Sequence, residues 1–484
     1  MKHTSAALRN LPYRWQAFFA VAFPLVTMVM SINITVLALP VIARDFGVTL
    51  KEVSWVVIGF SLTTTALLLP MGRLSALIGR RRVMLLGMAL FSGGTLLCAF
   101  AETLAVLNFG RVLTGVGAAM AQGVGTAVVV SVFPPEQRGK GIGYYTTAVA
   151  VGQAAGPALA GFLLEHYRWP SLFVALTIPA LLGLVWGFLI LDDERIGSFQ
   201  SDANGFDWVG AGLSSLAIVV FILAINNPFP FAQAWMLSAG IPAGLLLLLG
   251  FICWERQTSS PLLNLQLFLV REFRYAVAIR VFGFMSRSGS VLLLPVFLLS
   301  IRGLREGVIG LLMLAAALGS AVGAQSSGRL SDRYGPRRFM ILGLGLAIFS
   351  ALLISRFEVD TPLPVLAFVL FFNGAAMATW STPNQVMIMN ATPKTHFGTV
   401  GALVNLTRNT GNVIGQATVS AGITAMMVWQ GFDLPLSQVG KSSDSLAAFL
   451  NGWQVSYLVI IVFVLLALLG TIICRMPSPH PTRR

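Results

Sequence analysis

The chain is long and strongly apolar: of its 484 residues, 56% are hydrophobic and only 10% are Asp, Glu, Lys or Arg. Soluble domains carry about 25% charged residues, so this chain lacks the polar surface that a soluble protein needs. Its apolar content also excludes a disordered chain. The net charge of +14 therefore does not indicate a nucleic-acid interface, because the composition predicts a protein whose surface faces lipid.

Fourteen apolar segments each have about the 20 residues that a transmembrane helix requires. Lipid cannot satisfy free backbone N–H and C=O groups, so we expect helices, and continuous rather than alternating apolar runs exclude a β-barrel. The expected spans are 17–41, 53–72, 83–101, 104–132, 141–164, 170–191, 208–226, 236–254, 273–300, 307–327, 339–356, 363–389, 398–428 and 453–474. The sequence thus predicts an all-α polytopic membrane protein with 14 transmembrane helices.

The distribution of Lys and Arg predicts the orientation, because inside connections of membrane proteins are enriched in both. With the N-terminus inside, and with arginines at the span ends counted with the adjacent connection, 21 of the 32 Lys and Arg residues lie in inside connections and tails, 7 in outside connections and four well inside spans. We expect both termini in the cytoplasm and the inner (plasma) membrane of a bacterium as the location. The acidic connection 192–207 opposes this pattern, but acidic residues weigh little in the rule.

Two connections on the cytoplasmic side share a sequence pattern. Residues 72–87 read Gly-Arg-Leu-Ser-Ala-Leu-Ile-Gly-Arg-Arg-Arg-Val-Met-Leu-Leu-Gly, and residues 328–343 read Gly-Arg-Leu-Ser-Asp-Arg-Tyr-Gly-Pro-Arg-Arg-Phe-Met-Ile-Leu-Gly. Ten of the sixteen positions are identical at an offset of 256 residues, which chance recurrence of basic loops explains poorly. We infer a duplicated six-span unit. The predicted domains are an N-terminal six-helix bundle (1–191), two inserted transmembrane helices (192–254) and a C-terminal six-helix bundle (255–484).

The fifth span carries small residues at regular spacing. Gly143, Gly152, Gly156 and Pro157 follow the pattern Gly-x8-Gly-x3-Gly-Pro. Glycines four residues apart allow another helix to approach closely, and Pro157 removes a backbone hydrogen bond and permits a kink. We predict that Gly152, Gly156 and Pro157 act in a conformational change, with ordinary helix packing as the alternative.

Four arginines lie well inside spans, and an arginine costs about 2.5–3.5 kcal/mol at the bilayer centre. They are Arg111, Arg280, Arg287 and Arg408. We expect them to face a wet cavity, and a guanidinium group binds carboxylate or phosphate bidentately. The alternatives are that Arg280 snorkels to the interface, Arg111 bonds backbone carbonyls and Arg408 contacts nearby asparagines.

All 18 carboxylates lie in connections or at span ends. Those nearest to a span are Glu52, Glu102, Asp207, Glu255 and Glu306. Neutral polar side chains within spans are, like the arginines, candidates for binding the cargo. For any single amide, however, the better explanation is an interhelical hydrogen bond, which contributes about 0.6 kcal/mol. The predicted substrate-binding residues are Ser31, Asn33, Arg111, Gln122, Arg287, Asn373, Trp380, Asn384 and Arg408.

Several of these patterns resemble the major facilitator superfamily. The repeated loop is similar to its Gly-x-Leu-x-Asp-Arg-x-Gly-Arg-Arg signature, the fifth-span glycines resemble its antiporter signature, and Arg111-x3-Gly115-x-Gly117 resembles its Arg-x3-Gly-x-Gly motif. The ending Ala38-Leu39-Pro40 and the segment from Glu255 to Phe268 are similar to the fourteen-span drug:proton antiporter branch. The resemblance covers roughly residues 15–475 and implies the major facilitator fold.

The resemblance also implies functional residues. It assigns gating to Gly72, Arg73 and Gly79 of the first loop copy, and to Gly328, Asp332, Arg333 and Gly335 of the second. The first copy departs from the signature, with Ala76 at the acidic position. In the first span, Ser31 replaces the Asp that is usual in the branch and implied in proton coupling or cation recognition.

We therefore expect an efflux transporter for lipophilic, drug-like or amphiphilic small molecules, including anionic ones, that works by alternating access. Only the resemblance implies proton antiport. The spans carry no central carboxylate that could bind and release the transported proton. The alternative is an uncoupled facilitator or flippase for an anionic lipid or organic acid.

No catalytic motif is present, and Cys98, Cys253 and Cys474 lack metal-ligand spacing, so we expect neither an enzyme nor a metal or cofactor. The expected partners are the cargo, the bilayer and protons; the sequence does not identify an accessory export subunit.

Overall fold

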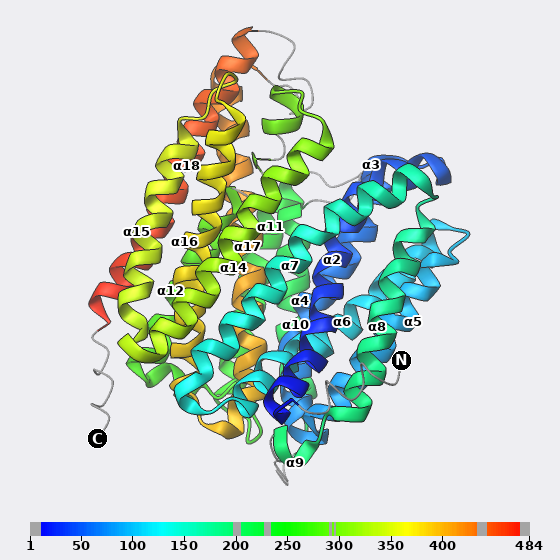
Figure 1. Ribbon diagram of the computed structural model, residues 1–484, viewed down its shortest axis with the longest axis vertical. Helices are drawn as coiled ribbons and strands as arrows, with labels where there is room; N and C mark the ends of the chain where they lie inside the picture. The colour runs from blue at the N-terminus through cyan, green and yellow to red at the C-terminus, as the bar shows by residue number, and fades with distance from the viewer. Residues whose placement is uncertain are drawn as a thin grey trace. The chain divides into compact units, whose positions relative to one another are not determined.

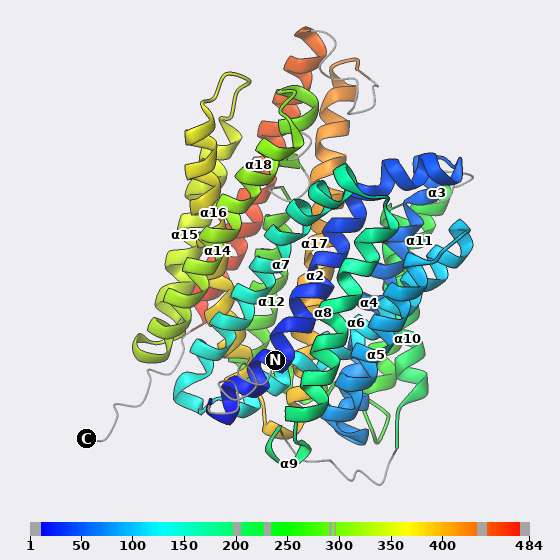
Figure 2. The same cartoon turned by 45° about the vertical axis from the view of Figure 1, so that its right-hand side comes forward.

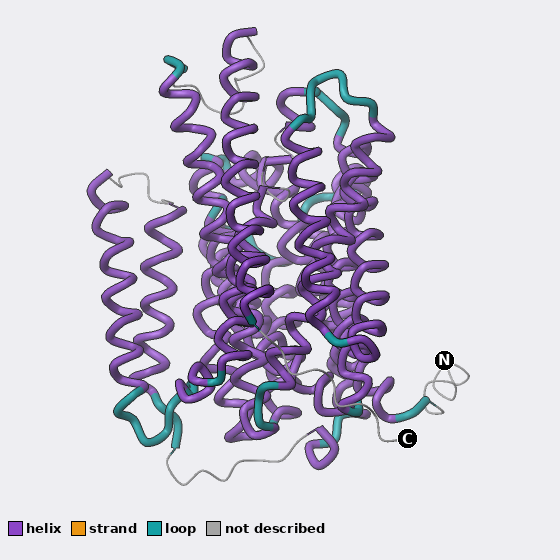
Figure 3. Tube along the Cα trace, turned by 90° about the vertical axis from the view of Figure 1, so that its left-hand side faces the viewer, coloured by secondary structure: helices purple, strands orange, loops and turns teal. Residues whose placement is uncertain are grey.

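The computed structural model describes residues 11–196, 205–226, 234–289, 293–294, 297–432 and 443–474. Within these ranges the secondary structure is helical, with loops between the helices (Figure 3). The long helices are α2 (Tyr13–Phe46), α4 (Trp55–Ile78), α5 (Arg80–Ala99), α6 (Leu104–Val132), α7 (Arg138–His166), α8 (Pro170–Ile190), α10 (Trp208–Asn226), α11 (Ala234–Glu255), α12 (Arg271–Ser288), α14 (Glu306–Tyr334), α15 (Pro336–Ser355), α16 (Leu363–Asn390), α17 (Phe397–Trp429) and α18 (Ser443–Ile473) (Figure 1). Short elements are α3 (Leu50–Val53), α9 (Asp193–Ile196), the 3₁₀ turns Pro135–Gln137, Leu265–Leu269 and Lys394–His396, and a π-helical turn at Phe297–Ile301.

Each of the expected spans overlaps one of the long helices. Ten of the described helices are long and apolar enough to cross a membrane. The helices α10 and α11 contain shorter apolar stretches, and α12 and α17 carry the arginines and amides that lower their hydropathy. The chain is thus an integral, multi-pass, helical membrane protein.

The chain forms two compact units. Unit 1 comprises Met1–Gly141, Val151–Leu269 and Met389–Leu406, and unit 2 comprises Ile142–Ala150, Val270–Ile388 and Thr407–Arg484. Each unit has an apolar core, centred on residues such as Ile34 and Phe173 in unit 1 and on Trp453 in unit 2. The division into bundles at residues 1–191 and 255–484 stays a prediction.

The inserted helices α10 and α11 belong to unit 1, where they pack against each other (Figure 2). Helix α10 also packs on α4, and the Ser215 hydroxyl donates a hydrogen bond to the Ala66 carbonyl oxygen at 3.0 Å. The outer side of α11 exposes large apolar side chains such as Leu246 and Leu249. This exposure fits a helix that faces lipid, because lipid solvates apolar side chains.

The two copies of the repeated loop have the same local structure. Gly79 and Gly335, which are 256 residues apart, both adopt positive φ angles, of 102° and 84°. Only glycine adopts this backbone conformation without strain. One turn earlier, Ser75 donates to the Gly72 carbonyl oxygen at 2.7 Å and Ser331 donates to the Gly328 carbonyl oxygen at 3.0 Å. The sequence repeat is therefore also a structural repeat.

A close helix approach occurs in both halves, but through glycines at different positions of the repeat. A Cβ atom on Gly115 would lie 2.9 Å from the Phe60 carbonyl oxygen, and one on Gly374 would clash with the carbonyl oxygen of Ala316. Ala316 is 256 residues after Phe60, whereas Gly374 is 259 residues after Gly115. Gly319 makes the reciprocal contact, because its Cβ would clash with the Phe371 carbonyl oxygen. Glycine thus lets α14 and α16 approach backbone to backbone.

We expect Gly319→Ala to lower the stability of the protein by about 1–3 kcal/mol, because the added methyl group forces two backbones apart. The measurement is the thermal unfolding midpoint of the detergent-solubilised protein. Gly310→Ala is the matched control, since it lies on the same helix with open space at its Cβ position. Equal midpoints for the two variants would show that the α14–α16 approach does not depend on glycine.

Candidate functional site

Matching arginines fasten each copy of the repeated loop to the last long helix of its own sequence half. The Arg81 guanidinium donates to the Phe188 carbonyl oxygen of α8 at 2.9 Å. Arg337, 256 residues later, donates to the Ile472 carbonyl oxygen of α18 at 2.7 Å. Both acceptors lie in the last turn of a helix, where carbonyl groups lack helical partners and the helix dipole favours cations.

The acidic connection after α8 accepts hydrogen bonds from the first copy of the repeated loop. This copy lacks the acidic residue of the signature at position 76. The Asp193 carboxylate accepts a hydrogen bond from the Arg81 backbone N–H, at the first turn of α5, at 3.0 Å. Arg80, which is buried, donates to the Ser131 hydroxyl at 2.6 Å and to the Ile196 carbonyl oxygen of α9. In the sequence this connection stands out only as a departure from the orientation rule, and no sequence pattern predicts its contacts.

The start of α17 packs against α4 and α6 within unit 1. A Cβ atom on Gly72 would lie 2.5 Å from the Ala402 Cβ and 3.0 Å from the Gly398 carbonyl oxygen. The Asn405 amide donates to the Gln122 carbonyl oxygen at 2.9 Å. Gly72, predicted as a gating residue, thus lies at a close approach of two helices from different sequence halves.

The predicted small-residue stripe of α7 packs on α2 in unit 1. A Cβ atom on Gly152 would lie 2.8 Å from the Val26 carbonyl oxygen, and one on Gly156 would lie 3.0 Å from the Asn33 Cβ. The Asn33 amide donates to the Val29 carbonyl oxygen of its own helix at 3.3 Å. α7 continues through Pro157 as one helix. The role of this stripe as a pivot stays a prediction.

Arg111 is fully buried in unit 1 and bonds Ser31, another predicted cargo residue. Its Nη1 donates to the Ser31 hydroxyl and its Nε to the Val56 carbonyl oxygen, both at 2.8 Å. The guanidinium lies 4.4 Å from the centre of the Phe60 ring. Among the described residues, Nη2 has no hydrogen-bond partner. The alternative that Arg111 bonds backbone carbonyls therefore holds for one of its nitrogens, and another is left to interact with a further group.

Three arginines of unit 2 form a cationic cluster. Arg280 and Arg287 of α12 both lie within electrostatic reach of Arg408 of α17. Arg280 is buried and stacks over the Phe284 ring at 4.9 Å, whereas Arg287 and Arg408 are partly exposed. Arg408 Nε also donates to the Asn409 side chain at 3.5 Å. Like charges repel one another, so an anion placed between them gains from each.

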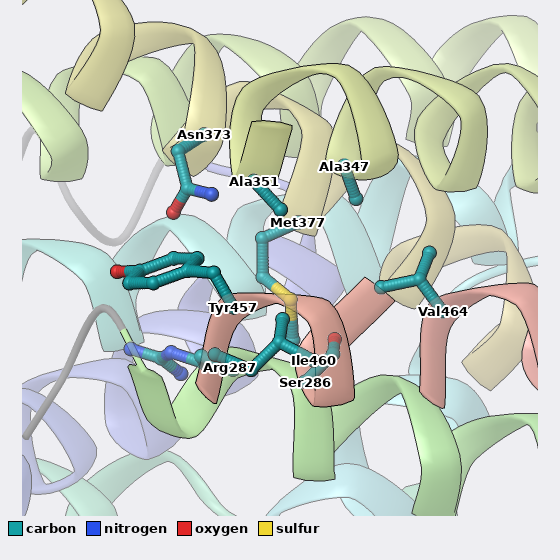
Figure 4. A pocket seen from close by; sticks show the side chains of 9 residues that line it. All are labelled: Ser286, Arg287, Ala347, Ala351, Asn373, Met377, Tyr457, Ile460 and Val464. Carbon is teal, nitrogen blue, oxygen red and sulfur yellow. The ribbon is translucent and has the colours of Figure 1, made fainter. Parts of the chain in front are cut away.

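Arg287 lines a cavity of about 20 Å³ in unit 2, which has room for about one water molecule. Ser286 and Arg287 line one side, Asn373 lies opposite and Tyr457 lies between them (Figure 4). The Asn373 amide donates to the Ser350 hydroxyl at 3.0 Å. The cavity thus joins a cation, an amide and a phenol from three helices. Arg287 and Asn373 were predicted from the sequence, whereas Tyr457 was not, because an aromatic residue in an apolar helix gives no distinguishing pattern.

Trp380 and Asn384 lie on the same face of α16 and are fully buried in unit 2. The Trp380 ring packs edge-on against Phe284 at 5.4 Å and fills the space above Gly283. Asn384 donates to the Ala276 carbonyl oxygen at 2.9 Å. Trp380 Nε1 and Asn384 Oδ1 have no hydrogen-bond partner among the described residues. Both residues pack α12 against α16, so contact with cargo requires these two helices to move.

Comparison with known proteins decides the family. The model of the Major Facilitator Superfamily matches residues 20–279 and 276–484. The chain belongs to the major facilitator superfamily.

Its members carry small molecules across membranes, so this protein is a transporter and not an enzyme. It is 27% identical to the riboflavin transporter RibZ of Clostridioides difficile over 408 residues, 84% of this chain and 88% of the relative. It is 26% identical to the multidrug efflux pump LfrA of Mycolicibacterium smegmatis over 457 residues, 93% of this chain and 88% of the relative. In fold it resembles the human organic anion transporter MFSD10, with a TM-score of 0.64 and 16% identity over 95% of this chain and all of that one.

Proposed function

We propose that this transporter exports lipophilic small molecules that carry a negative charge, across the inner membrane of a bacterium and with both termini in the cytoplasm. The observation that carries the cargo class is the cluster of Arg280, Arg287 and Arg408 in unit 2. Export as the direction draws on relatives such as LfrA, which is named as an efflux pump. The relative RibZ, named as a riboflavin transporter, supports an aromatic, drug-sized cargo.

The polar groups suit an amphiphile with one acidic head. Arg287 supplies two parallel N–H donors for a carboxylate, Asn373 adds an amide, and the Tyr457 ring offers an apolar face. The cavity holds about one water molecule, so only the acidic head enters it and the apolar remainder of the cargo lies outside. Trp380 Nε1 and Asn384 Oδ1 offer a donor and an acceptor once α12 and α16 separate.

Alternating access requires a gate that forms and breaks. The contact of Gly72 with Gly398 and Ala402 joins helices of the two sequence halves through small residues. Few atoms interdigitate at such a contact, so it separates without repacking large side chains. We infer that this contact closes the cytoplasmic end of the pathway and that cargo enters when it opens.

Energy comes from proton antiport in this proposal. The test is uptake of a fluorescent amphiphile with a free carboxylate into proteoliposomes, with and without an imposed pH gradient. An antiporter accumulates the dye on the acidic side, because protons leave that side as dye enters, and a protonophore abolishes the accumulation. Uptake that depends on the protein but not on the pH gradient would instead establish the alternative, an uncoupled facilitator or flippase for an anionic lipid or organic acid.

A further inference from the structure

Two buried carboxylates lie together where the inserted helices end. Asp207 immediately precedes α10 and Glu255 is the last residue of α11, one residue beyond the expected span 236–254. Only 6% of Asp207 and 4% of Glu255 are exposed. Both side chains border Gly210, since a Cβ atom there would contact the Asp207 carboxylate and lie 3.0 Å from Glu255 Oε1. A buried pair of acids is costly unless its charges are stabilised.

Each carboxylate holds a different part of the surrounding structure. Asp207 accepts hydrogen bonds from the Gly210 backbone N–H at 2.9 Å and from the Trp254 indole at 3.0 Å. Glu255 accepts from the backbone N–H groups of Leu262 and Leu263, both at 3.2 Å. Glu255 thereby ties the end of α11 to the connection that leads toward α12.

Glu255 is also electrostatically coupled to Arg73, the second residue of the first copy of the repeated sequence. Two charged groups act on it within the described part of the chain: Asp207, beside it, and Arg73 of α4, which is 5% exposed. Arg73 directly follows Gly72, the residue packed against Ala402. The charge of Glu255 therefore acts on Arg73, which is the neighbour in sequence of Gly72 and of the contact that we assign to the gate.

Burial raises the pKa of the Glu255 carboxyl to about 7, from an ordinary value near 4.5. The like charge of Asp207 acts in the same direction, while the two backbone hydrogen bonds and Arg73 oppose it. The packed arrangement therefore favours the protonated acid. In an arrangement that exposes Glu255 to water, its pKa returns toward the ordinary value. A rise in pH through 7 therefore favours the hydrated arrangement and loosens the packing around Asp207 and Glu255.

We propose that Glu255 is a pH-sensitive switch for the gate: the protonated acid stays buried and keeps the ends of α10 and α11 packed beside Arg73 of α4, and loss of the proton to the cytoplasm favours hydration of Glu255 and loosens this packing. The proposal rests on the proposed function for its role in transport. Under antiport it supplies a titratable group at the cytoplasmic end, where proton release accompanies opening of the gate. The spans themselves carry no acid in their middle third.

The experiment is a pH titration of tryptophan fluorescence on the purified full-length protein in detergent, without cargo. The signal of Trp254, whose indole bonds Asp207, is isolated by subtracting the signal of a Trp254→Phe variant. We expect a transition with its midpoint near pH 7 that disappears in Glu255→Gln. The glutamine keeps one acceptor oxygen and mimics the protonated state, so this variant should hold the low-pH signal at every pH.

Two further variants have predicted shifts of opposite sign. Asp207→Asn removes a like charge but keeps an acceptor oxygen, and should move the midpoint below that of the wild type. Arg73→Gln removes the opposing cation and should move it above. A transition that persists in Glu255→Gln, or shifts of the wrong sign, would overturn the switch. Because no cargo is present, these results are independent of whether the proposed anionic cargo is correct.

Discussion

Replacing Arg287 with alanine should raise the KM for a carboxylate-bearing amphiphile about 10- to 100-fold in reconstituted transport. A hydrogen bond to a charged group contributes about 1.5–3 kcal/mol, and each 1.4 kcal/mol corresponds to a tenfold change. Arg287 is partly exposed, lines a cavity with Asn373 and lies near Arg408. Arg287→Lys should fall between the wild type and Arg287→Ala, because lysine keeps the charge and loses the planar fork.

Arg274→Ala is the matched control, since Arg274 lies on the same helix but is exposed. It should transport the anionic amphiphile like the wild type. Transport of an amine analogue should be unchanged or faster in Arg287→Ala, because the variant removes a repelling cation. If Arg287→Ala expresses normally and retains the wild-type KM, Arg287 has a structural role and the cargo class must be reassigned.

Replacing Gly72 with alanine should reduce transport at least tenfold while leaving the protein folded. The new Cβ would lie 2.5 Å from the Ala402 Cβ, far inside van der Waals contact, so the start of α17 cannot pack on α4 as it does in the wild type. The measurement is initial uptake into proteoliposomes containing equal amounts of folded protein. Gly93→Ala is the control, because its Cβ position is open.

The Gly72 prediction has a specific rescue. Ala402→Gly removes the atom that the new methyl group meets, so the double variant Gly72→Ala/Ala402→Gly should recover part of the lost transport. Recovery is partial because the Gly398 carbonyl oxygen remains 3.0 Å from the new Cβ. Full activity of Gly72→Ala alone, or a double variant no better than the single one, would remove Gly72 from the gate.

The transmembrane helices were predictable because a bilayer imposes a length and an apolar composition on every span. The internal repeat was predictable for a similar reason. The positive φ angles at Gly79 and Gly335 require glycine in both copies. The repeated backbone turn is therefore visible in the sequence as a repeated glycine. Helix ends and the π-helical turn at Phe297–Ile301 depend on neighbouring helices and were not predictable from composition.

The site was predictable only as a set of residue types. Arg280 and Arg287 are seven residues apart, which is two helical turns, so they lie on one helix face. Only the packed structure distinguishes the buried Arg280 from the partly exposed Arg287. Asp207 and Glu255 were recognised only as acids near span ends, because their burial arises from a contact between segments about 50 residues apart. Trp380 was expected at the cargo, yet it fills space left by Gly283 on another helix, which no local pattern reveals.

The most direct test of the account compares three cargoes of identical skeleton that carry a carboxylate, a methyl ester or an amine. Their flux is measured through the purified wild-type transporter in proteoliposomes. An arginine-lined pathway predicts that the acid is carried best, the ester less well and the amine least. A protein that carries the amine best would contradict the proposal that Arg280, Arg287 and Arg408 select the cargo.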